Sequence, residues 1–456
     1  MKRTGKLTFK GGVHPPDYKE LSENAPIKSV PVPKQLAVML SQHIGAICKP
    51  LVNKKDKVVA GQLIGSADAF VSAPVHSPIN GTVKDIALSS HPVLGRAEAI
   101  IIDADEDNQA KQPCADKFDN SFSPDRFTPE QIFESVRNAG IVGMGGAGFP
   151  TNVKLKANPN SPIRAVVING CECEPFITCD YRIMLEWTNQ IIAGALLAAK
   201  ALNCRDIYIG VEDNKPKAVD AFRQAVKNMP AAAEIEVVAV KTKYPQGGER
   251  QLIKSILDKD VPAGGIPPMI GVLVDNVATA AAIAEAVVFG APLTYRPVTV
   301  SGSGVKEPGN FYAPVGMAAG DLIELAGGLT DDAVKIILGG PMMGFAVADL
   351  STPMTKTGGA ITILTAKEIG SIRMEAKETP CIRCGRCVEV CPVNLNPTKI
   401  AHAVKHNLLE MAESYHMSVC IECGCCSYVC PADIEVAGLI KTGKILAARA
   451  KKLMPK

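Results

Sequence analysis

Two short cysteine-rich segments in the last third of the chain carry its most specific chemical signal. They read CIRCGRCVEVCP from Cys381 and CIECGCCSYVCP from Cys420, and they agree at eight of twelve positions. Both follow the spacing C-x2-C-x2-C-x3-C-P, in which three thiolates can bind three corners of an iron–sulfur cubane. The fourth cysteine, before the proline, then ligates the cluster of the other segment. The spacing therefore predicts two [4Fe–4S] clusters with crossed ligands.

This crossed pattern assigns eight cysteines. The predicted ligands of one cluster are Cys381, Cys384, Cys387 and Cys430, and those of the other are Cys420, Cys423, Cys426 and Cys391. Cys425 adds a neighbouring thiol, but only Cys426 preserves both spacings, so Cys425 is expected to pack beside the cluster. A pair of structural zinc sites is the alternative, but zinc modules usually join two separate C-x2-C pairs around one ion. The duplicated triplet favours iron–sulfur clusters.

Clusters of this kind transfer single electrons, so an organic cofactor is expected elsewhere in the chain. Glycines of the segment NAGIVGMGGAGFPTNVKLK would let backbone N–H groups approach a phosphate, which a nearby lysine can neutralise. The preceding TPEQIFESVRNAG predicts an amphipathic helix with Thr128 as N-cap, Pro129 at N1 and Gly140 as C-cap. Without its sequence context, this glycine-rich loop is also typical of an ordinary tight turn. It matches neither the P-loop motif nor the GxGxxG motif. Its residues of interest are Gly143, Gly145, Gly146, Gly148 and Lys154.

Four β-branched segments follow the loop, and each leads into polar residues. They are IRAVVING (163–170), DIYIGVED (206–213), EIEVVAVK (234–241) and GVLVDN (271–276). Their alternation with helix-like stretches predicts a parallel sheet covered by helices, and such sheets bind ligands outside the carboxyl ends of their strands. The polar and turn residues that follow the strands are Glu172, Glu174, Asp180, Gly247, Gly248, Asn276 and Thr279.

Four of these loops, GMGGAGFPTNVKLK, NGCECEP, YPQGGERQL and VDNVAT, resemble signature loops of the flavin-binding, NADH-oxidising subunit of respiratory complex I. The resemblance implies a Rossmann-like FMN/NADH domain in which the glycine loop and Lys154 hold the FMN phosphate. It also implies that the flavin is lined by Asn169, Glu172, Gly247, Asn276 and Thr279. Positions near the nicotinamide nucleotide are matched by Phe149, Glu174 and Glu249.

Three positions of these loops depart from the family pattern. Cys171, Gly248 and Asp275 stand where the family usually has Asp, Glu and Asn. Cys171 also forms a sequence group with Cys173 and Cys179, whose spacing matches no familiar metal motif. We interpret these thiols as small packing residues.

The segments on either side of the predicted flavin domain indicate further modules. KKDKVVAGQLIG and VSAPVHSPINGTV resemble the halves of a biotinyl/lipoyl-type barrel, but no lysine occurs from Gln62 to Val83, so no swinging arm is expected. RPVTVSGSGVKEPGNFYAPVGMAAGDLIELAGGL resembles a soluble-ligand-binding β-grasp module. The expected fold class is therefore multidomain α/β with a helical, ferredoxin-type cluster segment. The predicted domains are a barrel at 1–112, a linker at 113–127, an FMN/NADH domain at 128–292, a β-grasp domain at 293–345 and a cluster domain at 346–456.

Composition and charge exclude several function classes. The 456 residues carry a formal net charge of +3, so no nucleic-acid partner is expected. No segment is apolar for long enough to span a bilayer, and the basic first ten residues lack the apolar core of a signal peptide. Fifteen cysteines without an export signal indicate metal ligation in a reducing compartment. We interpret the basic stretch from Lys441 to Lys456 as a solvated helix end rather than a docking patch.

The order of these modules is similar, over almost the whole chain, to that of the RnfC family of the Rnf electron transport complex. This resemblance implies a peripheral subunit on the cytoplasmic face of the bacterial inner membrane, held there by integral-membrane and iron–sulfur partner subunits. It implies electron exchange between NAD(H) and, indirectly, ferredoxin through FMN and two clusters, coupled to ion translocation. No catalytic side chain is expected, because the cofactors carry the redox chemistry. The alternatives are the NADH-dehydrogenase module of a soluble hydrogenase or formate dehydrogenase, and a non-catalytic electron wire or scaffold without flavin.

Overall fold

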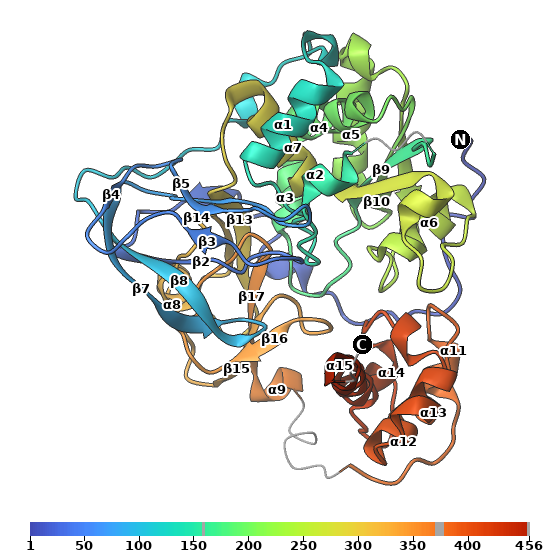
Figure 1. The fold of residues 1–456 in the computed structure, drawn as a ribbon. Coiled ribbons are helices and arrows are strands. Elements are labelled where there is room, and N and C mark those ends of the chain that lie inside the picture. The colour runs from blue at the N-terminus through green and yellow to red at the C-terminus, as the bar shows by residue number, and fades with distance from the viewer. Residues whose placement is uncertain (157–159, 370–377, 454–456) are drawn as a thin grey trace.

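The computed structural model describes residues 1–156, 160–369 and 378–453, which form a barrel-like region, a helix-covered sheet, a mixed sheet and a helical region (Figure 1). Part of the helical stretch predicted after Thr365, and Lys456 of the basic stretch, lie outside the described residues. Within those ranges, every helix is too short or too polar to cross a lipid bilayer.

The barrel-like region consists of two small sheets. One has the order β2-β8-β7-β4 and the other β3-β5-β6. Leu36 and Val38 of β2, and Ile100 and Ile102 of β8, are buried, whereas Ala37 and Ile101 between them are only partly buried, so one face of the first sheet is apolar. The strands are β2 (Gln35–Met39), β3 (Lys49–Pro50), β4 (Lys57–Val58), β5 (Leu63–Ser66), β6 (Val75–His76), β7 (Gly81–His91) and β8 (Gly95–Ala104).

The mixed sheet has six strands in the order β1-β14-β13-β17-β15-β16. Val298, Val300 and Ile361 belong to one hydrophobic core with Leu36 and Ile100, so the barrel packs directly on this sheet. The sheet extends beyond the predicted β-grasp segment, and we propose that this domain includes β1 and β17. Its elements are β1 (Ile27–Ser29), β13 (Tyr295–Ser301), β14 (Gly309–Pro314), α8 (Ala319–Leu325), β15 (Ala333–Leu338), β16 (Phe345–Val347) and β17 (Ala360–Thr365).

The helix-covered sheet contains four parallel strands in the order β11-β10-β9-β12. Successive β9 side chains enter two cores, since Val166 and Ile168 pack with α4 and α7, and Val167 packs with α6. A strand buried on both faces reads as a continuous apolar run, which explains the IRAVVING segment. The strands are β9 (Ala165–Gly170), β10 (Asp206–Glu212), β11 (Ile235–Val240) and β12 (Val272–Asn276). The helices are α1 (Pro129–Asn138), α2 (Thr151–Lys154), α3 (Cys179–Glu186), α4 (Thr188–Ala201), α5 (Pro216–Asn228), α6 (Glu249–Leu257) and α7 (Val277–Phe289).

The predicted start of α1 agrees with the structure. Thr128 and Gln131 form a reciprocal capping box, and Pro129 opens the helix. The C-cap is Ala139 rather than Gly140, and Gly140 follows it with a φ of 65°, the left-handed conformation that ends many helices.

The helical region lies below α6 in Figure 1 and contains both cysteine-rich segments. Its core joins Ile400 and Val404 of α12 to Val436 and Ile440 of α15, with Met417 between them. The two segments therefore lie on a small common scaffold. The helices of this region and the one before it are α9 (Ala366–Ile369), α11 (Arg386–Glu389), α12 (Pro397–Lys405), α13 (Leu409–Ser414), α14 (Cys425–Tyr428) and α15 (Val436–Leu453).

The first residues of the chain run across the other regions before the barrel begins. The backbone N–H groups of Gly5 and Leu7 donate to carbonyls at the end of α6. Gly12 donates to the Val390 carbonyl (2.8 Å), and Val13 forms a β-bridge with Tyr244. This segment therefore ties the helix-covered sheet to the helical region.

Lys356 joins three regions and has a testable pH signature. Its buried ammonium group donates to the Pro74 and Gly140 carbonyls, both at 2.7 Å, and burial lowers its pKa to about 8. Between about pH 8 and pH 10.5 the unfolded chain keeps a proton that the folded chain has lost, so this group makes stability rise with pH there. Relative to Lys356→Met, the wild type should gain up to about 1.4 kcal/mol per pH unit in this window.

The measurement is denaturant unfolding of the anaerobic protein at several pH values above 7. Lys335→Met is the control, because Lys335 is exposed on β15. Parallel pH profiles for Lys356→Met and wild type would contradict the assignment.

Candidate functional site

The carboxyl ends of the four parallel strands meet at one edge of the sheet, where the polar loops predicted from the sequence come together. The loop after β9 contacts the loop after β11, since the Asn169 side chain donates to the Gly247 carbonyl (2.8 Å). The first turn of α3, which follows this loop, contacts the start of α7, since Asn276 donates to Asp180 (2.6 Å). The Met144 N–H of the glycine loop donates to Thr279 (2.9 Å). The structure thus gathers the predicted loops at a single edge.

The tip of the glycine loop has the features of an anion-binding turn. Its base is closed by backbone bonds between Gly143 and Phe149 and between Gly148 and Gly143. The N–H groups of Gly145, Gly146 and Ala147 are exposed and donate to no acceptor within the described ranges. Gly146 has a φ of 109°, and a Cβ there would meet no heavy atom within 4 Å. Free, exposed N–H groups in a row fit the phosphate of a flavin nucleotide.

Lys154 lies at the end of α2, with its ammonium group against β12. Nζ donates to the Val274 carbonyl (2.8 Å) and to Asp275 Oδ1 (3.1 Å). An ammonium group carries three N–H donors, so one remains for an anion. The other carboxylate oxygen of Asp275 is buried and accepts no hydrogen bond. Asp275, which stands where the family usually has Asn, therefore gives Lys154 a fixed acidic partner. This carboxylate would compete with a bound phosphate for the ammonium group.

Two residues expected to line the flavin also hold the loops in place. Asn169 accepts from the Cys171 N–H (3.0 Å), and Asn276 caps α7 by accepting from the Ala278 N–H (2.8 Å). Gly247 allows the two loops to approach, because a Cβ there would lie 2.2 Å from the Cys171 carbonyl oxygen. Of the residues expected near the nucleotide, Phe149 is half-buried and Glu249 is exposed at the start of α6.

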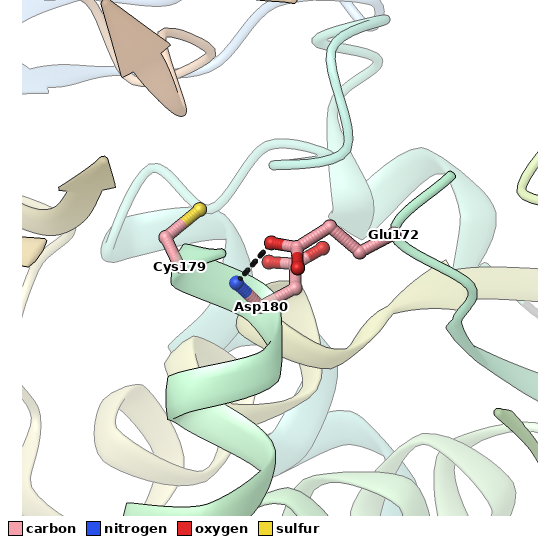
Figure 2. A group of neighbouring side chains, drawn as sticks. All are labelled: Glu172, Cys179 and Asp180. Carbon is pink, nitrogen blue, oxygen red and sulfur yellow. Dashed lines mark hydrogen bonds between the residues drawn. The ribbon is translucent and has the colours of Figure 1, made fainter. Parts of the chain in front are cut away.

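Carboxyl groups with raised pKa values lie in the loop after β9 and in the first turn of α3. Burial raises the pKa of Glu172 and of Glu174 to about 7 and raises that of Asp180. Near neutral pH Glu172 and Glu174 can therefore hold protons. Glu172 Oε1 accepts from the Asp180 N–H (2.7 Å), as Figure 2 shows, whereas Glu172 Oε2 accepts no hydrogen bond and lies 3.8 Å from Lys19 Nζ.

Glu172, Cys179 and Asp180 converge in Figure 2, with ligand atoms within 4.8 Å of one another. Their surroundings do not favour a metal ion. The Cys179 thiol donates to the Gly359 carbonyl (3.3 Å), and burial raises its pKa well above the usual value. The Lys19 ammonium group already provides a positive charge beside Glu172. We retain the interpretation of Cys179 as a packing residue.

Lys19 is a residue that the sequence did not single out. Its buried ammonium group donates to the carbonyls of Glu172 (2.9 Å), Glu174 (2.7 Å) and Ile177. Tyr18 stacks on Phe176 with ring centroids 4.6 Å apart. The N-terminal segment therefore fixes the shape of the loop after β9. Because the contact joins residues far apart in sequence, no local pattern could have indicated it.

The eight predicted cluster ligands fall into two groups. One group, which we call the outer group, lines a cavity of about 360 Å³. The other, which we call the inner group, lines a smaller hollow. Cys425 lines the smaller hollow too, where it is fully buried. Each hollow thus combines three cysteines of one segment with the last cysteine of the other, the combination that crossed ligation requires. The outer group is Cys381, Cys384, Cys387 and Cys430, and the inner group is Cys391, Cys420, Cys423 and Cys426.

The eight cysteines do not form the close group that a single zinc ion would require. Thiolates on one zinc ion, with Zn–S bonds of about 2.3 Å, lie roughly 4 Å apart. Among the described residues, no three of these cysteines bring their sulfur atoms within 4.8 Å of one another. The donor set is all-thiolate, as [4Fe–4S] clusters require.

The inner group lies against the loops of the sheet edge. The Tyr244 hydroxyl, in the loop after β11, donates to the Cys423 carbonyl (2.7 Å). Tyr244, Cys423 and Cys425 form one apolar cluster, to which Cys173 and Met342 also belong. Met342 donates its N–H to Glu174 (3.1 Å), and its carbonyl approaches Gly424. The candidate flavin loops and the inner group therefore share a packed junction.

Removal of the Tyr244 hydroxyl should loosen this junction. Burial raises the pKa of Tyr244 far above its usual value, so the hydroxyl remains a donor. Tyr244→Phe keeps the ring but leaves the Cys423 carbonyl without its donor, a loss of about 1–3 kcal/mol for a buried group. We expect a lower denaturant midpoint and slower NADH-dependent bleaching of the clusters.

Tyr208→Phe is the matched control, since the Tyr208 hydroxyl donates to the Met1 carbonyl near the amino end of β10, away from the carboxyl ends of the strands. Unchanged bleaching kinetics in Tyr244→Phe, or equal slowing in the control, would argue against the junction as a route for electrons.

Comparison with known families agrees with this arrangement. Residues 7–107 match the RnfC barrel sandwich hybrid domain, and residues 136–285 match the Nuo51 FMN-binding domain. Residues 297–346 match the SLBB domain, and residues 380–434 match the 4Fe-4S dicluster domain. The predicted fold class is confirmed. A solved NAD+-reducing [NiFe]-hydrogenase in the air-oxidized state has a similar fold, with a TM-score of 0.50 and 19% identity over 74% of this chain and 64% of its own.

Curated relatives match nearly the whole chain. The C subunit of the proton-translocating ferredoxin:NAD(+) oxidoreductase complex of Clostridium ljungdahlii is 41% identical over 90% of this chain and 87% of its own length. The Na(+)-translocating counterpart of Acetobacterium woodii is 39% identical over 89% of each chain. The C subunit of the ion-translocating oxidoreductase complex of Rhodobacter capsulatus is 37% identical over 89% of this chain and 76% of its own. The chain therefore belongs to the RnfC family of ion-translocating oxidoreductase complexes, as the module order predicted.

Proposed function

We propose that this chain is the NAD(H)-interacting peripheral subunit of a membrane-bound, ion-translocating ferredoxin:NAD+ oxidoreductase. It would pass electrons between NAD(H), FMN and two [4Fe–4S] clusters. Relatives that match about nine-tenths of the chain are named as subunits of such complexes. The observation that carries the proposal is the Tyr244–Cys423 contact, because it joins the candidate flavin loops to the inner group.

Each part of the strand edge has a role in this proposal. The free N–H groups of the glycine loop and Lys154 would hold the FMN phosphate, and Asn169, Glu172, Gly247, Asn276 and Thr279 would line the flavin. Bound FMN would accept an electron pair from NADH and release electrons singly to the clusters. Phe149, Glu174 and Glu249 would lie near the nucleotide.

The side chains of this protein mainly hold the loops in position and take up or release protons. Lys19 and the two asparagines fix the loops, which keeps the distance to the inner group constant. Glu172 and Glu174, with pKa values near 7, can hold or release a proton as charge builds up nearby. The outer group would exchange electrons with partner subunits. We propose that integral-membrane and iron–sulfur subunits hold the chain at the cytoplasmic face of the membrane.

Anaerobic purification followed by iron–sulfur reconstitution tests this function. The proposal expects FMN to be released on denaturation, and NADH to bleach the cluster absorbance of the native protein. A protein with its full iron content, but without flavin and without an NADH response, would instead support a non-catalytic electron wire.

A further inference from the structure

The two cysteine-rich segments belong to a longer duplication in which the backbone conformation repeats as well as the sequence. Gly385 and Gly424 each precede a short helix, α11 or α14, and have φ values of 80° and 78°. Arg383 and Glu422, just before them, have the same φ of 58°. Side chains at matched positions can therefore be compared directly, and differences between the two cysteine groups come from side chains rather than from the backbone.

One basic side chain occurs at the same position of both copies, and each is neutralised by a glutamate. Lys405 of α12 lines the outer cavity and pairs with Glu378. Its counterpart, Lys444 of α15, pairs with Glu422 and donates to the Cys420 carbonyl (3.0 Å) beside the inner hollow. These two lysines therefore give neither group an excess of positive charge.

Two arginines of the outer copy lack such partners. Arg383 and Arg386 are exposed and line the outer cavity, and neither forms an ion pair with a residue in the described part of the chain. Glu389, the acidic residue on the same short helix as Arg386, lies outside the lining of the cavity. The matched positions of the inner copy hold Glu422 and the fully buried Cys425. The outer group therefore faces two positive charges that the inner group lacks.

Solvent exposure differs between the two groups in the same direction. Cys381 and Cys384 are exposed, whereas Cys423 and Cys426 are buried. The loop that carries Tyr244 covers the inner group, since its hydroxyl donates to the Cys423 carbonyl. A cluster in the outer group would therefore lie closer to water than a cluster in the inner group.

Hydrogen bonds to sulfur also influence the potential of a cluster, but they occur in both groups. These neutral donors act on both clusters and largely cancel in the difference, whereas the two arginine charges act on the outer group alone. The contacts are Leu395 N–H to Cys391 Sγ (3.3 Å) and Glu422 N–H to Cys420 Sγ (3.4 Å) in the inner group, and Thr398 Oγ1 with Cys387 Sγ (2.8 Å) in the outer group.

Reduction adds one electron, and so one negative charge, to a cluster. Nearby positive charge and water stabilise the reduced form, and net charge and solvent exposure are among the features that set cluster potentials. We propose that Arg383 and Arg386 give the outer cluster a higher reduction potential than the inner cluster. An electron that reaches the inner cluster would pass to the outer one, so that the inner cluster is oxidised again and can take up the second electron of a pair. This inference rests on the proposed function, to which it adds the order in which the clusters fill.

An anaerobic redox titration of the reconstituted full chain tests this order, with dithionite as the reductant and EPR as the readout. The variants Cys423→Ala and Cys384→Ala identify the signals of the outer and the inner cluster. At low ionic strength, Arg383→Gln/Arg386→Gln should shift the reduction equilibrium of the outer cluster about tenfold toward the oxidised form. This shift lowers its midpoint potential by about 59 mV for one electron and should leave the inner midpoint unchanged. High salt should reduce the shift, because exposed charges are screened.

Two further variants separate the effect of charge from a structural role. Arg383→Lys/Arg386→Lys keeps both positive charges and should keep the midpoint potential of the wild type. Arg223→Gln/Lys227→Gln removes two exposed charges on α5 and should leave both midpoints unchanged. All variants are compared at equal iron content.

Dithionite reduces the clusters without NADH or FMN, so failure of this inference is distinguishable from failure of the proposed function. Two clusters that fill in the expected order, in a protein that does not respond to NADH, would support the inference and contradict the proposed function. Equal midpoints, a higher midpoint for the inner cluster, or an outer midpoint that the glutamine variant leaves unchanged would overturn the inference.

Discussion

Cys391→Ala is expected to abolish the inner cluster and to spare the outer one, although Cys391 belongs to the first cysteine segment. Cys391 lines the inner hollow with the three cysteines of the second segment, and its thiolate would be their fourth ligand. The reciprocal change, Cys430→Ala, should abolish the outer cluster. Each variant should lose about half of the iron, and the EPR spectrum of the reduced protein should lose the coupling between two clusters.

Cys425→Ala is the control for these variants, because Cys425 lines the same hollow but breaks the spacing. It should keep the full iron content. Two further single variants show which cluster survives. Cys423→Ala should give the same signal as Cys391→Ala, and Cys384→Ala should give the same signal as Cys430→Ala. If Cys391→Ala instead matched Cys384→Ala, ligation would be confined to single segments.

The second large effect concerns FMN affinity. In an Asp275→Asn background, Lys154→Met should weaken FMN binding roughly 10- to 100-fold, as expected for loss of one charge-assisted contact of about 1.5–3 kcal/mol. The background matters because Lys154→Met alone would leave the buried Asp275 carboxylate without its cation. Asp275→Asn alone should bind FMN at least as tightly as wild type, since it frees the ammonium group for the phosphate.

Riboflavin provides the discriminating ligand for this prediction, because it carries the same ring without the phosphate. Fluorescence titration of the apoprotein should show equal riboflavin affinity in Asp275→Asn and in the double variant. Equal losses for FMN and riboflavin would mean that Lys154 maintains the fold of the site rather than holding the phosphate.

The sequence was sufficient to predict those parts of the site that depend on local patterns. Apolar runs buried on both faces marked the parallel strands, and polar residues after each run marked the edge where β9, β11 and β12 end. Thr128 and Pro129 marked the start of α1. The cysteine spacing predicted which thiols the two hollows combine.

Contacts between distant segments were not predictable. Lys19 reaches the loop after β9 across more than 150 positions, and nothing in its neighbourhood distinguishes it from a surface lysine. Tyr244 belongs to a recognisable loop, but its bond to Cys423 depends on how two domains pack. Strand β1 joins a sheet whose other strands begin only at Tyr295. Such contacts depend on tertiary packing, which a residue pattern does not encode.

An anaerobic NADH titration tests the proposed electron route most directly. One preparation is titrated in three states: as reconstituted, stripped of FMN, and resupplied with FMN. NADH should bleach the clusters in the first and third states but not in the second, with unchanged iron throughout. Cluster bleaching without FMN, or none in the flavin-loaded protein, would contradict an electron route from NADH through the strand edge to the inner group.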